Sequence, residues 1–91
     1  MRPPRHTAQT AKNLIGPKLR LIRQSLKPAV TLDDLSGRLA ARGFYLDRTT
    51  LGRIERQERA VFDYEIFALA DALRVPFLDL LKPVAGSKGR R

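Results

Sequence analysis

Apolar residues recur at helical spacing along most of this chain, and strand-type alternation of apolar and polar residues is scarce. Ile15, Leu19, Ile22 and Leu26 are separated by 4, 3 and 4 positions, which places them on one face of a helix. Residues 66–73 carry a similar stripe. Because such stripes must be buried against other elements, the pattern predicts one all-α domain with a small core.

Capping signals set the bounds of the first two predicted helices. The first begins near Asn13 or Gly16 and ends at Pro28, which cannot continue a helix. Thr31 and Asp34 fit the capping-box pattern, in which each side chain accepts a hydrogen bond from the other residue's backbone. We therefore expect the second helix to begin directly after Thr31.

Three further helices follow from similar signals. Gly43 suits the left-handed residue that ends a helix, and residues 44–46 form a connector that we expect to cover the edge of the core. Asp47 and Asp63 are predicted N-caps of the third and fourth helices. Pro76 suits the first position of the fifth helix, which residues 77–81 complete.

The predicted third helix, residues 47–57, has two chemically different sides. Leu51 and Ile54 form a narrow apolar stripe that must face a core. The opposite arc has no acidic residue and carries Thr49, Gly52, Arg53 and Arg56. A glycine within a helix costs about 1 kcal/mol relative to alanine, and the close approach of another polymer would explain it. This composition suits a helix in the DNA major groove. The other interpretation is a face that only contacts water.

Basic residues are concentrated at the two ends of the chain. Residues 1–30 contain seven basic side chains and no acid, residues 82–91 contain four basic side chains and no acid, and the net charge is +9. We expect residues 1–12 to be a disordered basic arm and residues 82–91 a disordered basic tail. Such arms suit contacts with phosphates, and the other interpretation is that they only increase solubility.

The composition excludes several classes of function. There is no cysteine, and His6 in the N-terminal arm is the only histidine, so we expect neither a metal site nor a histidine-based catalytic dyad. The sequence contains no phosphate-cradling glycine loop, and no apolar run is long enough for a membrane span. We therefore expect a protein that is not an enzyme and needs no cofactor.

Four segments, in this order, resemble the Cro/lambda-repressor-like (Xre) helix-turn-helix family. They are residues 15–23, Leu35-Ser36, residues 48–55 and residues 69–75. The resemblance covers residues 13–81 and implies the five-helix lambda-repressor-like fold. In that fold the second and third helices form the DNA-reading pair.

The resemblance also implies roles for single residues. Arg48, Thr49 and Arg53 match base-contacting positions of the third helix, whereas Arg56 and Arg59 match positions that contact phosphate. We interpret the chain as a sequence-specific DNA-binding transcriptional regulator, a repressor. It would bind double-stranded DNA as a homodimer in the cytoplasm of a bacterium. Its gene would be bacterial or carried by a phage.

Arg23 and Glu55 match a partly buried ion pair that joins the first and third helices in the family. We expect this pair to have a structural role. Removing one partner would leave the other charge buried and unpaired, so the change should destabilise the fold and not only weaken binding.

Three features depart from the family pattern. Residues 42–46 make the connection between the second and third helices about five residues longer than the family's tight turn. Leu32 occupies a position where many members have a phosphate-binding glutamine, so we expect that contact either to be absent or to be made by Thr31 or a backbone amide. Gln57 replaces the glycine that commonly follows the third helix.

A second function stays open, in which the domain is an antitoxin-like or regulatory partner of another protein. An exposed apolar patch around Tyr64, Phe67, Phe77 and Leu78 would favour it. The fifth helix, Tyr64 and Phe67 are candidates for the dimer face, and the other interpretation is that they only pack against the domain. RNA binding is disfavoured because the stacking platforms of single-stranded RNA readers are missing.

Overall fold

The computed structural model describes residues 11–82, and it is all-helical over this range. The five helices are α2 (Gly16–Ser25), α3 (Leu32–Ala40), α4 (Arg48–Glu55), α5 (Asp63–Leu73) and α6 (Phe77–Leu81). The predicted all-α class and the order of the five helices are therefore confirmed for the described residues. The predicted disorder of the two ends concerns residues that lie almost wholly outside them.

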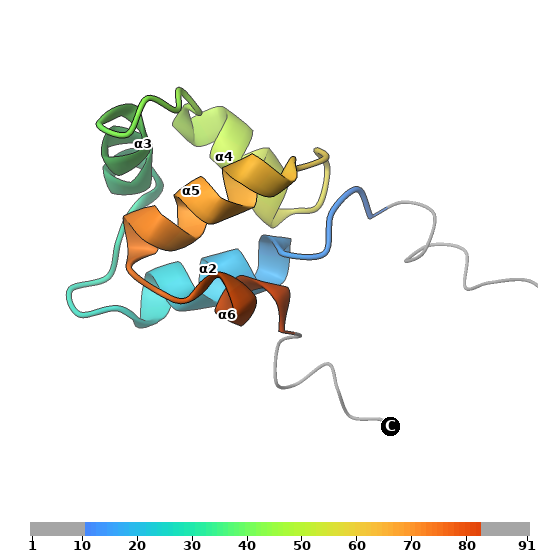
Figure 1. Ribbon diagram of the computed structural model, residues 1–91, viewed down its shortest axis with the longest axis horizontal. Coiled ribbons are helices and arrows are strands. Elements are labelled where there is room, and N and C mark those ends of the chain that lie inside the picture. Colours follow the sequence, from blue (N-terminus) through green and yellow to red (C-terminus); the bar gives the residue numbers. More distant parts are fainter. Residues whose placement is uncertain (1–10, 83–91) are drawn as a thin grey trace, which may run out of the picture.

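α5 crosses the front of the molecule in Figure 1, between α3 and α6. α3 packs against both α4 and α5, α2 packs against α4 and α6, and α6 returns to α5. Every helix contributes side chains to one core. The largest fully buried side chains are Ile15, Leu19, Leu35, Leu39, Leu51, Ile54, Leu69, Leu73 and Leu80.

Local hydrogen bonds fix the starts of α3 and α4 as predicted. The Asp34 amide donates to Thr31 Oγ1 at 3.0 Å, and the Thr31 amide donates to Asp34 Oδ2 at 3.1 Å, which completes the capping box. Asp47 Oδ1 accepts from the Thr50 amide at 2.8 Å. Gly43 has φ +86°, the left-handed conformation that glycine adopts at low cost.

The start of α5 differs from the prediction. Asp63 is the first helical residue and not the cap, because the chain enters the helix through Phe62. The Glu65 carboxylate accepts from the Phe62 amide at 3.0 Å and satisfies that end of the helix. Pro76 likewise precedes α6 as its N-cap and is not its first residue. In the 44–46 connector, Leu46 is buried in the core and Phe44 packs against it, as predicted, whereas Tyr45 is 82% exposed.

The N-terminal segment is joined to the loop that follows α4. The Lys12 amide donates to Gln57 O at 2.9 Å, so residue 12 is held to this loop. Asn13 Nδ2 donates to Ile54 O at 3.0 Å and to Arg59 O at 2.8 Å, and Asn13 Oδ1 accepts from the Gly16 amide. These contacts hold the start of α2 against the end of α4.

Gly16 allows the backbones of α2 and α4 to approach closely. A Cβ atom at this position would lie 2.7 Å from the carbonyl oxygen of Glu55 and still closer to that of Ile54. Both obstacles are backbone atoms, which cannot move away as a flexible side chain can. The glycine therefore sets how near α2 lies to the helix that carries the candidate interface.

Candidate nucleic-acid interface

α4 presents one side to the core and the other to solvent. Leu51 and Ile54 are fully buried, whereas Arg48, Thr49 and Arg53 are exposed. The structure thus brings the three predicted base-contacting residues together on the open side of one helix. None of the three is sequestered against a neighbouring helix.

Two exposed ion pairs border this surface. Arg48 Nη1 lies 3.3 Å from Asp33 Oδ2 of α3, and Arg56 Nε lies 3.2 Å from Glu58 Oε2. Within residues 11–82, Arg53 forms no ion pair. Solvent-exposed pairs contribute about 0–1 kcal/mol, so Arg48 and Arg56 can exchange these carboxylates for another anion at low cost.

A buried ion pair lies behind the surface and joins α2 to α4. Arg23 Nε donates to Glu55 Oε2 at 2.7 Å, and Arg23 Nη2 donates to Glu55 Oε1 at 2.9 Å. The two side chains are only 10% and 6% exposed. Arg23 Nη1 also donates to Val30 O at 3.0 Å, so one guanidinium fixes α2, α4 and the loop before α3. The predicted pair is therefore present, in bidentate geometry.

Arg59 forms a second partly buried pair, with Glu65 of α5. Its two terminal nitrogens lie 3.1 and 3.2 Å from the carboxylate oxygens. Burial alone would raise the pKa of Glu65, but hydrogen bonds from Arg59 and the Phe62 amide outweigh it and hold the pKa below its ordinary value. This geometry gives Arg59 a structural role in packing the loop on α5. The phosphate contact that the family resemblance implies for Arg59 stays a prediction.

Thr31 is also committed to the fold. Its amide and its hydroxyl hydrogen-bond to Asp34, which keeps the pKa of that carboxyl below its ordinary value. Asp33 lies in the same first turn, so an approaching phosphate would meet two carboxylates. The predicted phosphate contact of Thr31 stays a prediction, and these two carboxylates would oppose it electrostatically.

The sequence predicts that Gly52 lies on the open arc of α4. The structure differs, because Gly52 is buried. A Cβ atom there would lie 3.2 Å from Arg56 Nη1 and 3.9 Å from Leu32 Cδ1. The missing side chain therefore makes room for the guanidinium of Arg56, which lies back across the helix. The close approach inferred from this glycine is made by the chain's own arginine.

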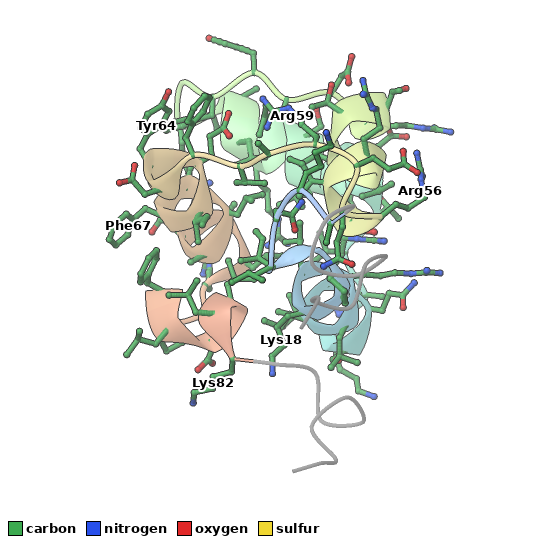
Figure 2. All side chains as sticks on the ribbon, turned by 90° about the vertical axis from the view of Figure 1, so that its right-hand side faces the viewer. Lys18, Arg56, Arg59, Tyr64, Phe67 and Lys82 are labelled. Carbon is green, nitrogen blue, oxygen red and sulfur yellow. The ribbon has the colours of Figure 1, made fainter. Side chains whose placement is uncertain are left out.

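The opposite side of the molecule carries exposed aromatic residues. Tyr64 and Phe67 of α5 are 56% and 57% exposed, and Leu78 of α6 is 64% exposed. The rings of Phe67 and Phe77 stack with centroids 4.0 Å apart. In Figure 2, Tyr64 and Phe67 lie on one side of the molecule and Arg56 on the other. We call Tyr64, Phe67, Phe77 and Leu78 the aromatic face.

Neither a cluster of metal-ligating side chains nor a membrane-spanning helix occurs within the described residues. Residues 11–82 contain no group of three or more side chains that could hold a metal ion, and His6 lies outside this range. None of the helices described here has the length and apolar character needed to cross a membrane.

No family model matches the chain, and no curated protein or solved structure matches it either.

Proposed function

We propose that this protein is a DNA-binding transcriptional regulator, a repressor, that inserts α4 into the major groove of double-stranded DNA. The observation that carries the proposal is the joint exposure of Arg48, Thr49 and Arg53 on one side of α4, whose other side is fixed in the core. No acidic residue belongs to this exposed side, although Asp33 of α3 contacts Arg48.

The three side chains suit recognition of base edges. A guanidinium can donate two hydrogen bonds to O6 and N7 of guanine, and a threonine can hydrogen-bond a base or contact the methyl group of thymine. Each good bidentate contact discriminates against the wrong base by about 1–3 kcal/mol. The buried Arg23–Glu55 pair supports this use of α4 because it holds the helix rigidly against α2.

The packing of α3 against α4, with α2 behind α4, supports the resemblance to the lambda-repressor-like fold. In that fold the helix before the reading helix lies across the DNA backbone. A single α4 spans only a few base pairs, so we propose a homodimer that binds an inverted repeat in the bacterial cytoplasm. Its half-sites would lie about 10–10.5 bp apart, one turn of the DNA helix.

Selection from a randomised pool of DNA duplexes tests the proposal directly. The full-length chain should enrich an inverted repeat, and the enriched duplex should bind much more tightly than a shuffled duplex of the same composition. Binding of both duplexes should weaken as salt is added, because phosphate contacts release counterions. Recovery of no common sequence, with equal affinity for every duplex at moderate salt, would contradict specific reading.

The aromatic face favours a second candidate function, in which the domain binds another protein. Its exposed rings and leucine form an apolar patch on the side away from α4. Sedimentation of the wild-type chain and of Phe67→Ser separates the two uses of this face. A dimer that Phe67→Ser dissociates assigns the face to self-association, whereas a wild-type monomer at high concentration favours a different protein as its partner.

A further inference from the structure

A shallow hollow lies between α2 and α4. It has a volume of about 240 Å³ and is lined by Arg20, Arg23, Leu32, Gly52, Glu55 and Arg56. The charges of Arg23 and Glu55 cancel because these two residues pair with each other. Arg20 and Arg56 therefore give the hollow a net positive charge, and both are exposed to solvent.

Gly52 determines the shape of this hollow. Without a Cβ atom at Gly52, the Arg56 guanidinium can lie over the α4 backbone, beside Leu32. Arg56 thereby lines the same hollow as Arg20 of the neighbouring helix. A Cβ atom at position 52 would make the guanidinium shift by a few tenths of an ångström, and the atoms nearest to it all belong to side chains.

We propose that this hollow binds one phosphate group of the DNA backbone, between the guanidinium groups of Arg20 and Arg56. The proposal rests on the proposed function and adds a contact from α2 that neither the sequence patterns nor the family resemblance supplied. Guanidinium groups bind phosphate oxygens through parallel N–H donors, and charge-assisted bonds of this kind are among the strongest in proteins.

The ion pairs of the described residues leave both arginines available for this contact. Arg20 forms no ion pair within residues 11–82. Arg56 contacts Glu58 at 3.2 and 3.4 Å in an exposed pair that a phosphate can replace. A phosphate held here would fix one DNA strand beside α4, on the α2 side, while Arg48 and Arg53 contact bases.

A pair of glycine variants tests the site without removing any charge. In Gly52→Ala the new methyl group would lie 3.2 Å from Arg56 Nη1, so the guanidinium must shift by a few tenths of an ångström, and Gly37→Ala is the matched control because a Cβ at Gly37 meets nothing within 4 Å. Both changes place alanine within a helix, so both should keep or raise the stability to unfolding. Gly52→Ala should bind the selected duplex about tenfold more weakly, and Gly37→Ala should bind like wild type.

A pair of charge variants tests the contribution of α2. Arg20→Gln should reduce the slope of log affinity against log salt by about one, equally on the selected and the shuffled duplex. Arg74→Gln is the control, because it removes the same charge from an exposed arginine at the end of α5. It should leave the slope unchanged.

The outcomes separate this site from the proposed function. If the wild-type chain binds no duplex, both proposals are wrong. If Arg53→Ala weakens sequence preference while Arg20→Gln and Gly52→Ala bind like their controls, the phosphate site alone is wrong. If Gly52→Ala is unstable, the salt slope of Arg20→Gln decides the question by itself.

Discussion

The arginine–carboxylate pairs on the open side of α4 differ from those behind this helix. We call the pairs behind it, Arg23–Glu55 and Arg59–Glu65, the junction. On the open side, Arg48 and Arg56 contact acids through exposed pairs 3.2–3.3 Å long. In the junction, Arg23 and Arg59 each bind a buried carboxylate with two nitrogens. Arginine–carboxylate pairs thus serve two purposes in this protein. The exposed pairs leave arginines available for another anion, and the buried pairs hold the elements of the fold together.

The energetic consequences of the two settings differ. An exposed pair contributes about 0–1 kcal/mol, because water screens both charges before and after the pair forms. Loss of one partner from a buried pair costs far more, because the remaining charge stays in a poorly solvated site. Substitutions in the junction should therefore change stability, and substitutions on the open side should change binding.

The largest expected effect is at Glu55, in the centre of the junction. Glu55→Ala leaves the Arg23 guanidinium buried without its carboxylate and should lower the free energy of unfolding by about 3–5 kcal/mol. Urea denaturation followed by circular dichroism measures this change. Glu58→Ala is the control on the open side and should stay within about 0.5 kcal/mol of wild type.

A smaller loss of stability is expected at Arg59. Arg59→Ala removes two hydrogen bonds from the buried Glu65 carboxylate and should lower the free energy of unfolding by about 1–3 kcal/mol. The same denaturation experiment applies. An unchanged stability together with a shallower salt dependence of DNA binding would instead make Arg59 a phosphate contact and would blur the distinction between the two regions.

The pH dependence of the free energy of unfolding tests one charge of the junction, that of the Glu65 carboxylate. Folding lowers the pKa of Glu65 from its ordinary value of 4.5, so its ionised form stabilises the fold above that pH. This stabilisation is lost as the pH falls through the lowered pKa. Glu65→Gln should therefore be less stable than wild type near neutral pH, and the difference should shrink below about pH 4.5. A difference that stays constant down to about pH 2 would show that the Glu65 charge is not linked to folding.

Features that depend on neighbouring residues could be predicted from the sequence. The Thr31–Asp34 capping box, the Asp47 cap and the left-handed Gly43 each involve residues at most three positions apart. The exposed side of α4 followed from the spacing of Leu51 and Ile54, because burial of one side of a helix exposes the other. The all-α class followed from the helical spacing of the apolar residues along the chain.

Features that depend on the course of a long side chain or on contacts between different elements could not be predicted. The burial of Gly52 results from the path of the Arg56 side chain and from Leu32, on another helix. Arg59 pairs with Glu65 across the loop before α5, and Glu65 then replaces Asp63 as the residue that caps this helix. No periodicity identifies such partners, because they depend on how the loops place the helices.

The most direct test of the account measures the preference of Arg53→Ala across all single-base variants of the selected duplex. Wild type should discriminate at the position that Arg53 contacts by about 1–3 kcal/mol, and the variant should lose this preference at one base pair of each half-site. Its stability should be unchanged, because Arg53 is exposed and forms no ion pair within residues 11–82. An equal loss of affinity for every duplex, with all preferences retained, would contradict base reading by α4.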